Sequence, residues 1–365
     1  MDRRTASCQG CLLGLAVGDA MGHPINEKNW DEIREDYGPN GLLGYDLVNG
    51  FATGSAYTQV AAYAANGLLL GITRGREDRY LAFMGLALRE WARAQHFPRD
   101  PEKSWCWVAK LPLMRGRKTK DSRMLDALRM ETLGTMERPS NRATGAGSLT
   151  AAVAVGLACG KGMQRNLAGS LGAQVVALTH GDPETFLCGS VLAESVASIL
   201  ENEKLSMKAH FAGAIDKMCV LYSIAYPQAD ALAQKLRHAI EQANSAGEEP
   251  REYVEKLGCD TAAQCLCTAV YACCLWENDF DNAMILSVNH SGRSAAVGSL
   301  TGALLGAKMG VEALPEFYLE SLEPGEVLKE LATDLAVGSL TAGLFDDDWD
   351  HKYVQGLPVN HGYMG

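Results

Sequence analysis

Signals for β-structure are nearly absent from these 365 residues. The chain shows no sustained alternation of polar and apolar residues and no hairpin dipeptide between β-branched runs. It also lacks an internal repeat of about 20–50 residues, and it lacks an apolar run of the roughly 18 residues that a membrane span needs. These absences exclude a β-sandwich, a repeat protein and a membrane-spanning protein.

Positive charge is also scarce. Lysine and arginine number 33 against 44 aspartates and glutamates, for a net charge of −11, which argues against nucleic acid as the main partner. The densest basic run, residues 115–120, is short and is expected to be a solvated loop. The apolar run near the N-terminus is short and passes directly into Gly18-Asp19. We therefore interpret it as a core helix rather than a signal peptide, and expect a cytoplasmic protein with no membrane partner.

The eleven cysteines do not form a metal or disulfide pattern. Most of them lie in apolar helical runs, where cysteine behaves as a small buried hydrophobe in a reducing compartment. Cys8 and Cys11 make one CxxC spacing, but no second CxxC completes a zinc set and no βαβ context supports a redox pair. We expect this pair to be one turn of a core helix.

Apolar residues recur with the helical period along almost the whole chain. Glycine and proline mark helix ends, as at Gly22-His23-Pro24, and loops are expected at residues 97–104 and 138–147. The pattern predicts an all-α fold in a single domain spanning residues 1–345. The expected helices span residues 7–21, 30–37, 58–72, 76–95, 122–131, 149–159, 166–178, 183–201, 207–222, 229–243, 261–276 and 280–288, followed by a last one that ends near residue 310.

That last helix carries an unusual row of glycines. Gly298, Gly302, Gly306 and Gly310 recur every fourth residue and so lie on one face. Interior glycines cost a helix roughly 1 kcal/mol each relative to alanine. A helix tolerates that cost where another backbone approaches closely, so this face predicts a tightly packed central helix.

Several short motifs occur in a fixed order along the chain. Residues 14–22 read GLAVGDAMG and are followed by Pro24, Ile25, Asn26 and Glu27; residues 55–59 read SAYTQ; residues 145–151 read GAGSLTA; residues 178–180 read LTH before Asp182-Pro183; and residues 289–294 read NHSGRS. These stretches resemble the motifs of the ADP-ribosylglycohydrolase family, which includes dinitrogenase-reductase-activating glycohydrolase. The resemblance covers roughly residues 8–312 and implies an orthogonal helical bundle of that type.

The resemblance also implies a hydrolase with two magnesium or manganese ions. In the family, a Thr-Asp-Asp group and an Asp-x-Asp group hold the metals and orient the ribose of an ADP-ribosyl group, while a carboxylate activates water. This chain has Ala56 and Tyr57 at the first aspartate pair, and Arg293 and Ala295 at the second. Hard cations need several oxygen ligands, and a permanent arginine charge repels them. We therefore expect no metal cofactor.

The matched positions predict a cleft for ADP-ribose or a related nucleotide-like ligand. Arg293, near a helix N-terminus, is suited to hold phosphate through a two-pronged contact, or else it pairs with a neighbouring carboxylate. Glu27 and Asp19 are the candidate catalytic carboxylates, and Asp46 and Asp182 are further carboxylates that are expected near the cleft. The expected ligand-binding residues are Ser55, Tyr57, Gly145, Gly147, Ser148, His180, Asn289, Ser291, Gly292, Arg293 and Ser294.

Three functions stay open at this point. The first is a family member that has lost metal-dependent hydrolysis and retains the cleft. The second is a metal-independent glycoside hydrolase that uses Glu27 with Asp46 or Asp19. The third is a scaffold or interaction protein without a small-molecule site, whose protein partner the sequence does not identify.

The C-terminal tail, residues 346–365, begins with the one dense acidic cluster of the chain, DDDWDH. A solvated terminus is the expectation for such a segment. Two alternatives are that the tail supplies carboxylates to the cleft or that it closes against Arg293.

Overall fold

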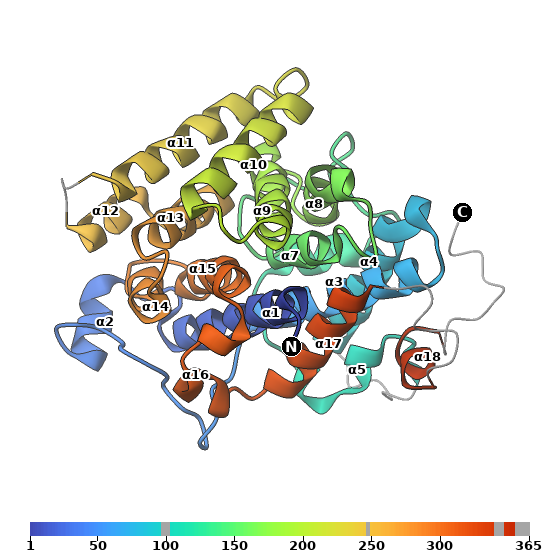
Figure 1. The fold of residues 1–365 in the computed structure, drawn as a ribbon, viewed down its shortest axis with the longest axis horizontal. Helices are drawn as coiled ribbons and strands as arrows, with labels where there is room; N and C mark the ends of the chain where they lie inside the picture. The colour runs from blue at the N-terminus through green and yellow to red at the C-terminus, as the bar shows by residue number, and fades with distance from the viewer. Residues whose placement is uncertain (96–102, 246–248, 339–346, 355–365) are drawn as a thin grey trace.

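The computed structural model describes residues 1–95, 103–245, 249–338 and 347–354 (Figure 1). These residues form eighteen α-helices, a few 3-10 turns and three isolated β-bridges, with no strand among them. The first nine helices are α1 Arg3–Gly22, α2 Trp30–Tyr37, α3 Ala56–Thr73, α4 Tyr80–Ala94, α5 Trp107–Lys110, α6 Ser122–Arg129, α7 Thr150–Ala158, α8 Ala168–Ala177 and α9 Pro183–Glu201. The other nine are α10 Met207–Tyr222, α11 Gln228–Ala243, α12 Pro250–Leu257, α13 Ala262–Leu275, α14 Phe280–Val288, α15 Ser294–Met309, α16 Glu316–Glu320, α17 Gly325–Val337 and α18 Asp347–Tyr353. The all-α prediction is confirmed.

Most of the expected helices form close to their expected bounds. The predicted spans of α2, α9, α10 and α14 match the observed ones. Residues 76–95 differ, because a 3-10 turn at Glu77–Arg79 precedes α4. The helices that the periodicity did not predict are α5, α12, α16, α17 and α18. The expected loop at residues 97–104 lies mostly outside the described residues.

The core is organised around α1 and α15, which lie side by side at the centre of the bundle (Figure 1). Three glycines of each helix face each other, and we call these six residues the glycine seam: Gly10, Gly14, Gly18, Gly298, Gly302 and Gly306. A Cβ atom added at Gly302 would lie 1.9 Å from the carbonyl oxygen of Gly14. The predicted close backbone approach is thus confirmed, and it is reciprocal because α1 carries its own row of glycines.

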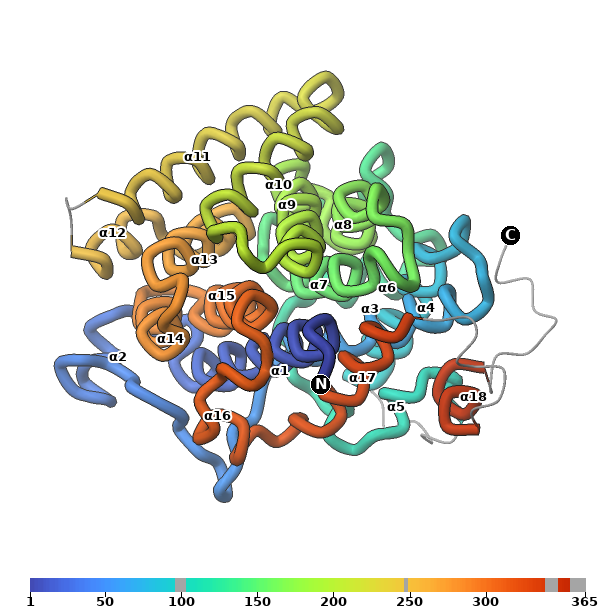
Figure 2. Tube along the Cα trace, viewed as in Figure 1, coloured from blue at the N-terminus to red at the C-terminus, as the bar shows by residue number. Residues whose placement is uncertain are grey.

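The remaining helices surround this pair. Helices α7 to α11 and α13 lie on one side, and α3, α4 and α17 lie on the other (Figure 1). The segment between α2 and α3 runs out to the edge of the molecule and returns beside α16, where Ala52 forms a bridge to Leu322 (Figure 2). Among the described residues, no helix combines the length and the apolar character needed to cross a bilayer.

All eleven cysteines lie in the described residues and are unpaired; nine are buried, and Cys219 and Cys274 are partly buried. The expectation that they are mostly buried hydrophobes is confirmed. Cys8 and Cys11 both lie in α1, in the core rather than at a metal or redox centre.

The acidic tail is not a solvated terminus over its described part, residues 347–354. Trp349 and Tyr353 of α18 are buried, and the Trp349 indole donates to the Thr73 hydroxyl at the C-terminal end of α3. Lys352 forms ion pairs with Glu330, Asp334 and Asp348, which fastens α18 to α17. The expectation of solvation is wrong here because the two aromatic side chains add apolar surface that packs against the bundle.

Candidate functional site

A cavity of about 430 Å³ lies where three helices begin. Its wall includes the first residues of α3 and of α6 and also Arg293, which directly precedes α15, so three positive helix-dipole ends lie at this wall. Such an arrangement favours an anionic or strongly polar ligand. The charged residues of the wall are Glu27, Lys118, Lys120, Asp121, Arg123, Asp260 and Arg293.

Asp19 fixes the start of α3 from beneath. Its carboxylate is fully buried and accepts four hydrogen bonds, from the backbone and hydroxyl groups of Ser55 and Thr58, at 2.6–3.0 Å. Both carboxylate oxygens are therefore engaged, and Asp19 does not line the cavity. This geometry gives Asp19 a structural role, which is to hold Ser55 at the cavity wall.

Tyr57 and Arg293 lie together where the family motifs would place aspartates. The Arg293 Nε donates to the carbonyl oxygen of Asp260 at 2.8 Å, and the rest of the guanidinium lies beside the Tyr57 hydroxyl. Burial raises the pKa of Tyr57 well above its usual value, so Tyr57 is a neutral phenol. Burial opposes the charge on Arg293, but Tyr57, Cys265 and Glu27 outweigh it and raise the pKa of the guanidinium. Arg293 is a permanent cation in the wall.

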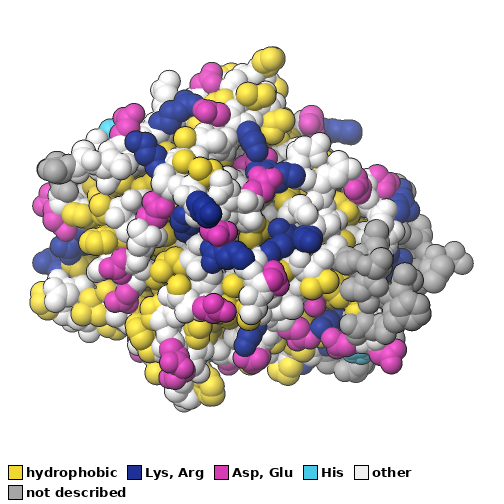
Figure 3. Space-filling model, in the orientation of Figure 1, with side chains coloured by type: hydrophobic (Ala, Val, Ile, Leu, Met, Phe, Trp, Pro, Cys, Tyr) yellow, Lys and Arg dark blue, Asp and Glu magenta, His cyan; other side chains and the backbone are white. Residues whose placement is uncertain are grey.

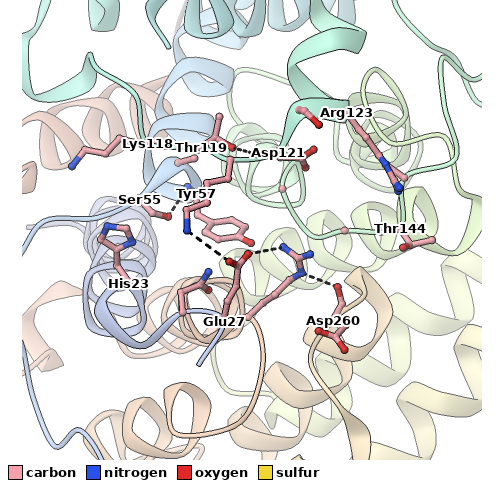
Figure 4. A pocket seen from close by; sticks show the side chains of 18 residues that line it. His23, Glu27, Ser55, Tyr57, Lys118, Thr119, Asp121, Arg123, Thr144 and Asp260 are labelled. Carbon is pink, nitrogen blue, oxygen red and sulfur yellow. Dashed lines mark hydrogen bonds and ion pairs between the residues drawn. The ribbon is translucent and has the colours of Figure 1, made fainter. Parts of the chain in front are cut away.

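Glu27 lies on the cavity rim with an unusual backbone. Its φ angle is +68°, in a region that residues other than glycine rarely adopt. Glu27 N–H donates to the Gly292 carbonyl at 2.7 Å, while the preceding Asn26 accepts from the N–H of Ala295 in the first turn of α15. These two contacts fix the loop against α15 and turn the Glu27 side chain toward the cavity (Figure 4).

The Glu27 carboxylate lies between two cations. Its oxygens are 3.9 Å from Arg293 and 3.9 Å from Lys120, beyond hydrogen-bond distance, and the side chain is half exposed. Figure 4 shows Glu27 directed toward the middle of the site, with Tyr57 and Asp260 nearby.

His23 lies on the same wall. Burial lowers the pKa of His23, and the positive charges of Lys118 and Lys120 lower it further, whereas Asp19 opposes this shift.

Asp121 is a further carboxylate of the wall. One oxygen caps α6 by accepting from the N–H of Met124, and the other lies 3.3 Å from Nε2 of the fully buried His180. The second ring nitrogen of His180 lies 2.8 Å from the Ser148 hydroxyl. Burial would raise the pKa of Asp121, but His180, the Met124 N–H and Arg293 hold it below its usual value. Gly147 leaves room here, because a Cβ at this position would lie 2.9 Å from the Asp121 carboxylate, whereas a Cβ at Gly145 would meet only the His180 ring, at 3.9 Å.

The turn before α15 is built by internal hydrogen bonds. Asn289 is buried and bonds both the N–H and the carbonyl of Leu42 at 2.7–2.8 Å. The Ser291 hydroxyl accepts from the Trp30 N–H, and the buried Ser294 hydroxyl donates to the carbonyl oxygen of His290. Gly292 adopts a φ of +114°, which the turn requires. These four residues shape the wall without lining it.

The structure therefore brings together part of the predicted site. Glu27, Ser55, Tyr57, Gly145, Gly147 and Arg293 line the cavity, whereas Asp19, Ser148, His180, Asn289, Ser291, Gly292 and Ser294 support it from behind. Asp46 accepts from the Tyr37 hydroxyl and Asp182 caps α9, both outside the wall.

Sequence reasoning missed several residues of the wall, chiefly His23, Asn26, Lys118, Lys120, Asp121 and Arg123. The basic run 115–120 forms a loop, as predicted, and the Lys120 side chain is 89% exposed; the prediction did not anticipate that Lys118 and Lys120 also line the cavity. The sequence did contain a signal for these residues: positive charge is scarce in this chain, yet the basic run 115–120 is followed directly by Asp121 and Arg123.

The residues present do not fit the two metal ions that the family motifs imply. The described residues contain no group of three or more histidine, cysteine or acidic side chains arranged to hold a metal ion. The Arg293 guanidinium and the Tyr57 phenol occupy the motif positions instead. A cation placed there would be repelled by Arg293 and would find no set of carboxylates.

The fold is a bundle of α-helices around the central pair α1 and α15, with a polar cavity where helix N-termini meet. Solved structures contain the same fold. A structure described as an "ADP-ribosylglycohydrolase-related protein complex" superposes with a TM-score of 0.61 and 22% identity, over 93% of this chain and 100% of that one. At this identity the likeness establishes the fold.

The chain belongs to the ADP-ribosylglycohydrolase family, whose model matches residues 1–343. An uncharacterized protein from Archaeoglobus fulgidus is 36% identical over 105 residues, which are 28% of this chain and 32% of that protein. The match thus spans about a third of that curated relative's length. The family resemblance in the motifs is confirmed, and so is the orthogonal helical bundle type of the fold.

Proposed function

We propose that this protein is an ADP-ribosylglycohydrolase family member that has lost metal-dependent hydrolysis and binds ADP-ribose or a related nucleotide-like ligand. The single observation that carries the proposal is the Tyr57–Arg293 contact at the positions of the family's metal aspartates, beside an open polar cavity. A volume of about 430 Å³ lies within the range of small-molecule sites. The site thus retains room for a ligand while the metal ligands are replaced.

Calorimetry with ADP-ribose in the presence of EDTA tests this proposal. We expect binding in EDTA, with an affinity that added manganese leaves unchanged. Tyr57→Ala should weaken binding, whereas Tyr37→Ala, which alters a tyrosine outside the cavity, should not. An absence of binding at millimolar ADP-ribose would remove the proposal, and binding that requires manganese would contradict the loss of the metal site.

A second candidate, metal-independent hydrolysis of a glycosidic bond, is supported by two carboxylates on the same wall. Glu27 and Asp121 both line the cavity, and a carboxylate pair can act as general acid and general base. Asp121 thus replaces Asp19 and Asp46 as the expected companion of Glu27. Turnover of ADP-ribosylarginine in EDTA that is abolished by Glu27→Gln and by Asp121→Asn would support this candidate, and no turnover would remove it.

The third function, a scaffold without a small-molecule site, receives less support. An occluded or apolar cleft would favour it, whereas the cavity is open and seven of its wall residues are charged. Charged residues of both signs are also interspersed over the face shown in Figure 3, which gives no single-sign surface for a partner to recognise.

A further inference from the structure

The cations of the cavity wall outnumber its carboxylates. Arg293, Lys118, Lys120 and Arg123 contribute four positive charges, and Glu27, Asp121 and Asp260 contribute three negative ones. The Asp121 carboxylate is already engaged by the Met124 N–H and by contact with His180. Glu27 is therefore the carboxylate that faces the cations most directly.

Glu27 holds this position weakly. It is half exposed, its contacts to Arg293 and Lys120 are both 3.9 Å long, and neither is a hydrogen bond. Exposed ion pairs of this kind contribute little to stability. The backbone of Glu27 is also strained at φ +68°, so the loop retains a costly conformation that directs this side chain toward the cations.

Arg293 has donors to spare. Its Nε donates to the Asp260 carbonyl, and the Tyr57 hydroxyl also contacts the guanidinium, so the group is held in place while further N–H donors of its terminal nitrogens remain near the cavity. Two terminal nitrogens of a fixed guanidinium match two oxygens of a phosphate group. Lys120, whose side chain is 89% exposed, can reach the same anion from the opposite side of Glu27.

We propose that Glu27 is a resident counter-ion that occupies an anion subsite between Arg293 and Lys120, and that a phosphate group of the ligand displaces it. The inference rests on the proposed function only in using the same cavity as the ligand site. It specifies the ligand further: the group that enters between Arg293 and Lys120 is an anionic phosphate rather than a neutral sugar. The positive dipole ends of α3 and α15 add to the preference for an anion.

Calorimetry in low salt with EDTA tests the subsite, using inorganic phosphate and ribose 5-phosphate as ligands and ribose as the neutral control. We expect both phosphates to bind and ribose not to bind. Lys120→Gln should weaken phosphate binding about tenfold, and Arg293→Gln at least as much, because each removes one cation from the anion. Arg237→Gln, which removes an exposed arginine of α11 outside the cavity, is the matched control and should change nothing.

Glu27 gives the sharpest result, because most binding-site substitutions weaken a ligand whereas this one should strengthen it. Glu27→Gln removes the charge and keeps the side-chain size, and Glu27→Gly also removes the backbone strain. We expect both variants to bind phosphate several-fold more tightly, by similar factors. Melting curves establish that each variant is folded; if Arg293→Gln is not, Lys120→Gln and the Glu27 variants decide the question.

Phosphate binding that is equal or weaker in Glu27→Gln would overturn the inference, as would binding that is unaffected by Lys120→Gln. Failure of the proposed function has a different signature. If ADP-ribose does not bind but phosphate binds and tightens in Glu27→Gln, the subsite stands and the nucleotide proposal falls. If ADP-ribose binds and neither phosphate nor Glu27→Gln alters its affinity, the nucleotide proposal stands and the subsite falls.

Discussion

The glycine seam and the cavity wall are neighbouring regions that respond differently to substitution. In the seam, backbone meets backbone, and a single added methyl group at Gly302 would lie 1.9 Å from a carbonyl oxygen. In the wall, half-exposed side chains such as Glu27 meet across open space at 3.9 Å. The seam tolerates almost no change in shape, whereas the wall can change its chemistry without disturbing the fold.

This contrast explains how a family frame persists beside a rebuilt site. The motif positions Gly14 and Gly18 act through the absence of side-chain atoms. The motif positions Tyr57 and Arg293 act through the side chains that they present to the cavity. Replacing residues of the second kind leaves the helix packing of the seam intact, so the fold is retained where the side chains of the wall differ.

The largest effect is expected from breaking the seam. Gly302→Ala places a Cβ against the Gly14 carbonyl and should lower the free energy of unfolding by about 3 kcal/mol or more, because overpacking against backbone cannot be relieved by a rotamer change. Gly213→Ala is the control. Gly213 lies in α10 with no atom near the place of a Cβ, so alanine there should raise the free energy of unfolding by about 1 kcal/mol. Denaturation followed by circular dichroism measures both, and equal midpoints for the two variants would contradict the contrast.

Substitutions of Asp19 and Glu27, which lie eight positions apart, should differ in their effect on stability, because Asp19 has a structural role and Glu27 lines the cavity. Asp19→Ala leaves the Ser55 and Thr58 donors without a partner and should cost about 2–3 kcal/mol of stability. Glu27→Gly removes two weak contacts and a strained backbone, so stability should change by about 1 kcal/mol at most. Thermal melting of the two variants checks the difference, and a larger loss in Glu27→Gly would assign the roles the other way round.

His210 offers a pH test of the packed interior that leaves the cavity untouched. Burial, together with Lys308, lowers the pKa of His210 from 6.5 to about 4. The unfolded chain therefore binds this proton below pH 6.5, while the folded protein resists it until about pH 4. The stability that the neutral, buried His210 contributes is complete above pH 6.5 and decreases by about 3 kcal/mol as the pH falls to 4. Relative to the natural chain, His210→Gln should lose less stability between pH 7 and pH 4; an identical pH profile would refute the prediction.

Restoring the family carboxylates should have a small energetic effect but a specific one. A variant with Ala56→Asp, Tyr57→Asp, Arg293→Asp and Ala295→Asp supplies oxygen ligands and removes the repelling cation. We expect it to bind Mn²⁺ about tenfold more tightly than the natural chain, which corresponds to about 1.4 kcal/mol. The same four positions changed to asparagine form the control, because asparagine has similar size without charge. Equal manganese affinity in the two variants would show that other residues limit metal binding.

The helical frame could be predicted from the sequence because helix periodicity and the glycine row are local patterns. Gly298, Gly302 and Gly306 share a face by spacing alone, and that face predicts a close neighbour. The sequence did not predict that this neighbour is α1, because α1 lies almost three hundred positions earlier in the chain. Helix α17 was missed although its buried face, which includes Leu328, Leu331 and Leu335, follows the helical period.

The site could be predicted only where a motif residue points outward. Ser55, Tyr57 and Arg293 begin helices and face the cavity, as their places in the motifs suggest. Asn289 and Ser148 occupy equally specific motif positions, yet each is drawn inward by a hydrogen bond to a distant group that the sequence does not reveal. Lys120 and Asp121 belong to a loop between α5 and α6, and only the folded bundle places them opposite Glu27.

The position of the glycine seam has a consequence for biosynthesis. Gly14 and Gly302 lie 288 positions apart, so α1 leaves the ribosome long before the partner that covers its buried residues has been made. Closing so long a loop costs roughly 5 kcal/mol of chain entropy. Until α15 has been synthesised, the apolar helix α1 has no packing partner. Nascent chains that stop short of α15 should therefore depend on chaperones and be rapidly degraded. We therefore expect the core to form only after α15 has left the ribosome.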